Sequence, residues 1–353
     1  MKDNKKCLSR RDFFKISSIG LGAASAFPYL NGCTESKMAT NTNIELKQEV
    51  KKNKNGGERD SPGHCSNDNL LAQRILGKTG MEVSLLAFGG GSQFMKNDEG
   101  EWEPLLERAI EEGINYFDTA NNYNDGDSEI RYGKILSQYR DRVYVATKLE
   151  ARGADSSKEH FERCLKRLKM DYVDVLLIHA LDKKDNLIAL ENGVYKSLIQ
   201  FKNEGTARCI GFSIMNESDV PFAKSVIENF DVGVVLGVIN PMGNYGNCAG
   251  LLQITKEKGI GFLAMKTLRG LVSPETTAKE LITYALDREN VTAAVIGHHG
   301  IDKLEKNITI VKEYALNTSV PNRWSALEKR VNQYVENRKP VWTLPGYHDG
   351  MMV

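Results

Sequence analysis

Short apolar runs alternate with stretches in which apolar residues recur every three or four positions, and this alternation covers about 250 residues. The apolar runs predict strands, and the stretches between them, such as "EPLLERAIEEG" and "HFERCLKRLK", predict amphipathic helices. Several of the helical stretches end in glycine, which is common at helix C-termini. The predicted strands are 85–89, 114–119, 143–148, 173–179, 209–213, 234–240, 261–266 and 293–297.

Eight strands that alternate with eight helices match a (β/α)₈ barrel in number and length. Some strands, such as "VDVLLIHA", are continuous apolar runs, as expected for strands buried on both faces. The alternative is a doubly wound open sheet with a glycine-rich phosphate turn, but "FGGGSQF" matches that turn poorly. We therefore predict a TIM barrel over 73–320. A hairpin around "RILGKTGMEVS" is expected to plug its floor, and a C-terminal tail, 321–353, to pack over one end.

The first 32 residues are expected to be an export signal and not part of the fold. Basic residues are followed by "SRRDFFK", with adjacent Arg10 and Arg11, and then by a weakly apolar run, which is typical of a twin-arginine signal. The run ends in "LNGC", which resembles a lipobox with Cys33 as the lipidated residue. We expect an exported, periplasmic or membrane-anchored lipoprotein. Residues 33–72 are polar and glycine-bearing, and they are expected to form a flexible tether.

Composition excludes some classes of function. Lys and Arg number 47 against 46 Asp and Glu, so the net charge of +1 does not favour a nucleic-acid partner. No apolar stretch is long enough to span a membrane as an ordinary helix. The cysteines show no CxxC spacing, and Cys164 and Cys209 lie in predicted core elements, so we expect no disulfide. Nothing near the pair His298–His299 completes a metal shell.

Ionisable side chains occur at the ends of three successive predicted strands. Asp118 ends the second strand, Tyr123 follows in its loop, Lys148 ends the third strand and His179 the fourth. The C-terminal ends of barrel strands meet at one mouth, so these four side chains are expected to converge. An ammonium beside a phenol stabilises the phenolate, so we expect Lys148 to lower the pKa of Tyr123. Asp118 would hold the lysine, and a neutral His179 would orient a carbonyl oxygen.

These features resemble the aldo-keto reductase superfamily. The stretches "RILGKTGMEVSLLAFGG", "FDTANNY", "SEIRYGKIL", "VATK", "DVLLIH", "GFS" and "IGHHGIDKLEKN" appear in the family's order. The resemblance implies an NAD(P)H-dependent reductase of small-molecule carbonyls, with Tyr123 as the general acid in a tetrad with Asp118, Lys148 and His179. It is nearest to exported bacterial members, which share "AMK". A dinucleotide pool is absent outside the cytoplasm, so tight cofactor retention is expected.

The resemblance also implies residues that bind NADPH, or less often NADH. They are Ser213, Lys266, Leu268, Gly297, His298, Lys303 and Asn307. Lys303 and the neighbouring histidines favour the 2′-phosphate of NADPH. Some positions depart from the family pattern: Ile214 replaces an asparagine, Leu236 a glutamine, Met265 an aromatic residue and Lys306 a glutamate.

Two other functions stay open at this stage. The altered cofactor positions are compatible with a regulatory protein that binds cofactor on the same barrel without significant turnover. A lyase that forms a Schiff base through Lys148 or Lys266 is the third possibility, because barrels also host that chemistry. Substrate identity and oligomeric state are not encoded in any pattern that we can interpret.

Overall fold

The computed structural model describes residues 70–243, 247–316 and 324–351. The predicted signal, the lipidation site at Cys33 and most of the tether lie outside these residues. In the part of the chain that the structure describes, no helix is both long and apolar enough to cross a bilayer. In the same part, no cluster of three His, Cys, Asp or Glu side chains is arranged to hold a metal ion.

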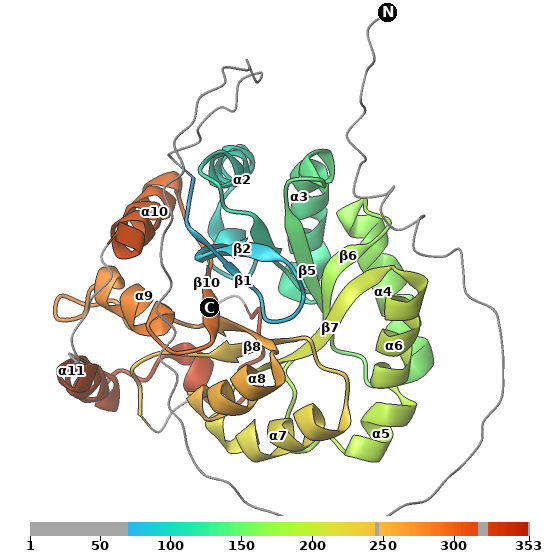
Figure 1. Ribbon diagram of the computed structural model, residues 1–353. Coiled ribbons are helices and arrows are strands. Elements are labelled where there is room, and N and C mark those ends of the chain that lie inside the picture. The colour runs from blue at the N-terminus through green and yellow to red at the C-terminus, as the bar shows by residue number, and fades with distance from the viewer. Residues whose placement is uncertain (1–69, 244–246, 317–323, 352–353) are drawn as a thin grey trace, which may run out of the picture. The chain divides into compact units, whose positions relative to one another are not determined.

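Eight parallel strands close into a barrel in the order β10-β3-β4-β5-β6-β7-β8-β9. The predicted (β/α)₈ fold is therefore confirmed, and each predicted strand boundary lies within two residues of the observed one. Helices follow the strands along the chain and surround them (Figure 1). The strands are β3 (Leu86–Gly89), β4 (Tyr116–Asp118), β5 (Tyr144–Leu149), β6 (Val173–Ile178), β7 (Ala207–Ile214), β8 (Val234–Val238), β9 (Gly261–Met265) and β10 (Val291–Ile296).

The helices have apolar faces that pack against the strands and polar faces that are exposed to solvent. In α4, for example, Phe161, Cys164 and Leu168 are buried, and they recur at the spacing of one helix face. The helices are α2 (Trp102–Glu111), α3 (Asp127–Ile135), α4 (Ala154–Leu168), α5 (Leu187–Asn192), α6 (Val194–Glu204), α7 (Val220–Asn229), α8 (Leu252–Lys258), α9 (Ala278–Leu286), α10 (Ile301–Leu316) and α11 (Trp324–Glu336).

A short antiparallel hairpin, β1 (Gln73–Ile75) with β2 (Glu82–Ser84), closes the floor of the barrel. Its turn donates from the backbone N of Lys78 to the carbonyl of Gly259, which lies just before β9 begins. Leu76 is fully buried there. The floor is the end of the barrel at which the strands begin, so the opposite end is free for a functional site.

The chain after α11 returns to the mouth of the barrel. The 340–351 segment contains a short helical turn, Val341–Thr343, and runs to residues that contact the ends of β4, β6 and β9. Trp342 is buried, and its indole Nε1 donates to the carbonyl of Arg269 at 2.8 Å. The 340–351 segment is therefore part of the mouth.

Candidate active site

Three of the four residues expected to act together, Asp118, Tyr123 and Lys148, meet at the ammonium group of Lys148. Lys148 in β5 donates through Nζ to Asp118 Oδ2 at 2.6 Å, to the carbonyl of Thr119 at 2.8 Å and to Tyr123 Oη at 3.0 Å. The Lys148 side chain is fully buried. Three acceptors satisfy all three donors of a protonated amine, so the site is built for Lys148 as a cation.

Tyr123 is held in place by a strained loop between β4 and α3. Asn124 and Asp125 have φ values of 49° and 53°, and Gly126 follows with 90°. The Arg167 guanidinium lies so close to Gly126 that a Cβ there would come within 2.1 Å of it. Left-handed conformations at non-glycine residues cost free energy and concentrate at functional sites. Their place directly after Tyr123 indicates that the ring position is imposed by the loop.

His179 follows β6 and faces Tyr123. The two ring centroids are 5.8 Å apart in an edge-on arrangement. The next residue, Ala180, has a φ of 49°, and its backbone N donates to the Ser213 Oγ at 2.8 Å. The structure therefore brings all four residues of the expected tetrad, Asp118, Tyr123, Lys148 and His179, to one place.

A fifth ionisable residue, which the sequence analysis did not include, lies at the centre of this group. Asp349 accepts a hydrogen bond from Tyr123 Oη at 2.7 Å, and the same carboxylate oxygen, Oδ2, lies 3.1 Å from His179 Nε2. Its other oxygen, Oδ1, pairs with Lys266 Nζ. Asp349 is 226 positions from Tyr123 in the chain, so no local pattern predicts this contact.

The expected net lowering of the Tyr123 pKa was wrong. The pKa of Tyr123 is raised well above its usual value, first because burial disfavours the phenolate and then because Asp349 and Asp118 lie nearby. Burial would also raise the pKa of Asp349, but Lys266, His179 and Lys148 together hold it well below the usual range. In this arrangement Tyr123 is a protonated donor to an ionised carboxylate.

Two opposing influences act on the pKa of the Asp118 carboxyl group. Burial raises its pKa, and the Lys148 ammonium opposes that shift. One of its oxygens is bonded to Lys148, whereas Oδ1 has no hydrogen-bond partner among the described residues. Asp118 therefore acts on Lys148 through a single short contact at the end of β4.

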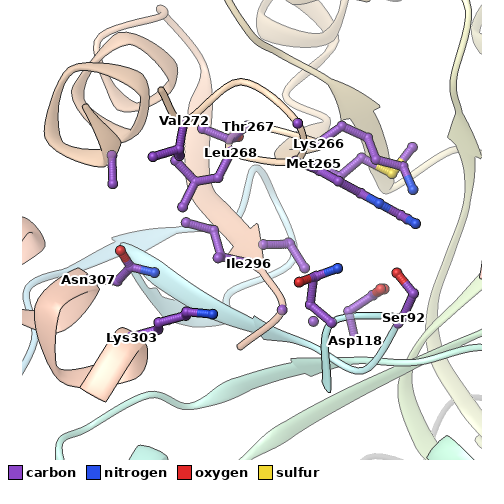
Figure 2. Close-up of a pocket in the computed structure, with 18 of the residues that line it drawn as sticks. Ser92, Asp118, Met265, Lys266, Thr267, Leu268, Val272, Ile296, Lys303 and Asn307 are labelled. Atoms are coloured by element: carbon purple, nitrogen blue, oxygen red, sulfur yellow. The ribbon is translucent and has the colours of Figure 1, made fainter. Parts of the chain in front are cut away.

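An elongated cavity of about 460 Å³ extends from these residues to the beginning of α10. Figure 2 shows Asp118 and Lys266 near one end of this cavity and Lys303 and Asn307, both from α10, at the other. The backbones of Gly89 and Gly297 lie close together. A Cβ added to either residue would lie 3.1 Å from the backbone of the other. An open channel lined by basic residues fits a dinucleotide that carries phosphates.

The residues that the resemblance assigned to the cofactor fall into two groups. Lys266, Leu268, Gly297, Lys303 and Asn307 line the cavity. Ser213 and His298 do not line it. Ser213 is buried and accepts a hydrogen bond from the loop that follows His179, so it supports the catalytic loop from behind.

His298 is packed into the core beside β3. Its ring centroid is 5.1 Å from that of Phe88, and neither ring nitrogen has a hydrogen-bond partner among the described residues. Burial lowers its pKa to about 3, so the ring is neutral at ordinary pH. A neutral ring that faces the core cannot bind a phosphate, which corrects the expectation for this residue.

The positions that depart from the family pattern are also placed by the structure. Ile214 is buried at the end of β7 and Leu236 in the middle of β8, whereas Met265 and Lys306 line the cavity. Lys306 thus adds a second cation beside Lys303 on the first turns of α10. Two cations at this end strengthen the fit to a phosphate-bearing ligand.

Comparison with known proteins identifies the family. A sequence profile described as "Aldo/keto reductase family" matches residues 85–280, more than half of the chain. L-galactose dehydrogenase of Arabidopsis thaliana is 27% identical over 281 residues, which cover 68% of this chain and 88% of that protein. The uncharacterized oxidoreductase YqkF of Bacillus subtilis is 30% identical over 40% of this chain and 49% of its own length.

The fold comparison agrees with the sequence comparison. The holo form of the aldo-keto reductase AKR11C1 from Bacillus halodurans has a TM-score of 0.62 and 22% identity, covering 75% of this chain and 96% of that one. At this identity the likeness supports the fold, while the profile and the curated relatives support the chemistry. The chain belongs to the aldo/keto reductase family and is an oxidoreductase.

Proposed function

We propose that the protein transfers hydride between NADP(H) and a carbonyl or alcohol substrate, with Tyr123 as the general acid and base. One observation carries this proposal. Tyr123 Oη lies 3.0 Å from the Lys148 ammonium, and a single oxygen of Asp349 contacts both Tyr123 Oη and the Nε2 of His179. A substrate carbonyl needs its oxygen at such a point.

Each residue of the tetrad has a separate task. Tyr123 donates a proton to the substrate oxygen during reduction and accepts it back during oxidation. The ammonium of Lys148 stabilises the phenolate that is left behind, and Asp118 keeps that ammonium in position. His179 donates from Nε2 and orients the substrate oxygen toward Tyr123.

The cofactor would be held along the cavity between β9 and α10. The bound dinucleotide would supply or accept the hydride at the substrate carbon. The chain's contribution is to bind its phosphates with the backbone around Leu268 and with Lys303 and Lys306. The two lysines on α10 favour NADPH over NADH, because the 2′-phosphate adds negative charge there.

Tyr123→Phe tests the proposal, because it keeps the ring and removes the proton. With NADPH and a panel of aldehydes and ketones, we expect kcat to fall by about 10²- to 10⁴-fold with little change in cofactor affinity. Tyr334→Phe, on α11, is the matched control and should retain full activity. Equal rates for Tyr123→Phe and the unmodified protein would contradict the proposal.

A cofactor-binding protein without turnover is the alternative, and one observation favours it. Asp349 occupies the point at which a substrate oxygen must bind. Absence of turnover over the whole panel, together with tight NADPH binding measured by fluorescence, would support this alternative. A lyase acting through Lys148 is disfavoured, because three hydrogen-bond acceptors already surround that buried amine.

We also propose export by the twin-arginine route and a lipid anchor on Cys33. The support is the order of motifs in the first 33 residues. Replacing Arg10 and Arg11 by lysine should retain the protein in the cytoplasm, and Cys33→Ala should release the exported protein from membranes. Exported protein from a strain with both arginines replaced would count against the route.

A further inference from the structure

Asp349 occupies the position that a substrate requires. A reducible carbonyl must accept hydrogen bonds from Tyr123 Oη and from His179 Nε2 at one oxygen atom. Asp349 Oδ2 does so at 2.7 Å from Tyr123 and at 3.1 Å from His179. An ionised carboxylate only accepts hydrogen bonds, so both partners donate to it, as they would to a carbonyl oxygen.

The second oxygen of the Asp349 carboxylate indicates that this site prefers an anionic ligand. Asp349 Oδ1 pairs with Lys266 Nζ, and the exposed fraction of the Lys266 side chain is 9%. Lys266 has a φ of 54°, a strained backbone that directs this residue away from the continuing strand. Removing the charged partner of a nearly buried ammonium without replacing it is costly, so any ligand that displaces Asp349 gains by bringing an anion to Lys266.

The 340–351 segment reaches this position through polar contacts and close backbone packing. The Asn122 amide donates to the carbonyl of Asp349 at 3.0 Å, and Arg269 donates to the hydroxyl of Tyr347 at 2.7 Å. Gly350 lies against the Tyr123 ring with a φ of 90°, and a Cβ there would come within 2.3 Å of that ring. Water and an external ligand can replace most of these polar contacts.

Space for a larger ligand lies on both sides of Asp349. The cofactor cavity adjoins it on one side, and a second cavity of about 520 Å³ adjoins it on the other. The second cavity is lined by Arg152, His179 and Asn216 among others. Asp349 thus separates two spaces that a bound cofactor and a bound substrate would need to join.

We propose that Tyr123, His179 and Lys266 form a carboxylate-binding site that Asp349 fills from within the chain, and that 2-oxo acids compete with Asp349 for it. The keto oxygen of such an acid would accept from Tyr123 and His179, and its adjacent carboxylate would pair with Lys266. Reduction would move a hydride from the dinucleotide to the keto carbon and a proton from Tyr123 to its oxygen, giving a 2-hydroxy acid and the oxidised dinucleotide.

The substrate assignment rests on the proposed function, whereas binding of the acid does not. The test is therefore calorimetric titration without cofactor, using pyruvate and its neutral analogue of the same shape, pyruvamide. We expect Asp349→Ala to bind pyruvate at least 10-fold more tightly than the unmodified protein does. We also expect it to prefer pyruvate to pyruvamide by at least 10-fold, and Asp349→Ala/Lys266→Met to lose that preference.

Two further variants control for a general charge effect and for a failure of Asp349→Ala to fold. Glu336→Ala removes an exposed acid from α11 and should bind pyruvate like the unmodified protein, which excludes a general charge effect. If Asp349→Ala does not fold, Asp349→Asn keeps the shape of the side chain and should still show the gain for pyruvate. Equal affinity of Asp349→Ala for pyruvate and pyruvamide, or no gain over the unmodified protein, would overturn the proposal.

A titration with NADP⁺ shows whether the anion that replaces Asp349 at Lys266 comes from the dinucleotide phosphates or from a 2-oxo acid. If the dinucleotide phosphates are what replaces Asp349, then Asp349→Ala gains affinity for NADP⁺ and shows no preference for pyruvate, which refutes the 2-oxo acid assignment. Binding of pyruvate as expected, in a protein that reduces no carbonyl, would support the site while refuting the proposed function.

Discussion

The two ends of the barrel are closed in different ways. At the floor, the β1–β2 hairpin packs backbone against backbone: a Cβ on Gly77 would come within 2.3 Å of the backbone N of Gly261. At the mouth, the 340–351 segment is held by charged and hydrogen-bonded side chains, with Asp349 at the centre. No ligand can replace the backbone contacts at the floor, whereas a ligand can replace the side-chain contacts at the mouth. The difference separates a structural closure from one that is suited to binding.

The largest expected effect is at the floor. Gly77→Ala should lower the free energy of unfolding by about 4 kcal/mol, because the new Cβ meets backbone and the residue has a φ of 53°. Gly80→Ala in the same turn is the matched control: its φ is 73°, but nothing lies within 4 Å of the added Cβ, so only about 1 kcal/mol is expected. Equal losses in denaturant unfolding would show that the close contact is unimportant.

The next largest effect is expected at His298, and it distinguishes a histidine buried in the core from one that binds the cofactor. Its pKa is lowered to about 3 from 6.5, so the unfolded chain binds a proton at pH values where the folded protein does not. The histidine therefore reduces stability progressively as the pH falls from 6.5 toward 3. His298→Leu should be more stable than the unmodified protein by about 3 kcal/mol at pH 4 and nearly equal at pH 7. A constant difference across this range in urea titrations would contradict the buried neutral state.

A smaller effect is expected at the mouth, from Asp349→Asn. The folded-state pKa of Asp349 is depressed, so its stabilisation is complete above the unfolded value of about 3.8 and is lost as the pH falls below it. At pH 7 the substitution should cost about 1 to 2 kcal/mol, less than an irreplaceable buried pair, because water can reach Lys266 once the segment leaves. Hydrogen exchange in the 340–351 segment should increase while exchange in the barrel strands stays unchanged.

The smallest expected effect is that of Trp342→Phe. This change removes the hydrogen bond from the indole to the Arg269 carbonyl and keeps most of the apolar contact. We expect a loss of about 1 kcal/mol, confined to docking of the 340–351 segment. Proteolysis near the segment should become faster without a shift in the unfolding midpoint of the barrel. A shift as large as that of Gly77→Ala would mean that the mouth closure is as structural as the floor.

Most of the fold and the tetrad could be predicted from the sequence. The hydrophobic periodicity identifies the strands, and parallel strands in a closed barrel must bring their C-terminal ends together. Asp118, Tyr123, Lys148 and His179 therefore converge because each stands at or just after the end of its strand. The one signal for Asp349 was an acid in a glycine- and aromatic-rich tail, "WTLPGYHDG", and that composition does not say where the tail docks.

The sequence by itself determined the barrel, the order of its strands and the tetrad at the mouth, because these follow from local periodicity and strand topology. Tertiary structure alone decided which groups touch. It turned His298 toward Phe88 and brought Asp349 to Tyr123 across 226 positions. It also reversed the expected pKa shift of Tyr123, since burial and a second carboxylate outweigh the nearby lysine. Such shifts depend on distances between residues remote in sequence, which no local pattern encodes.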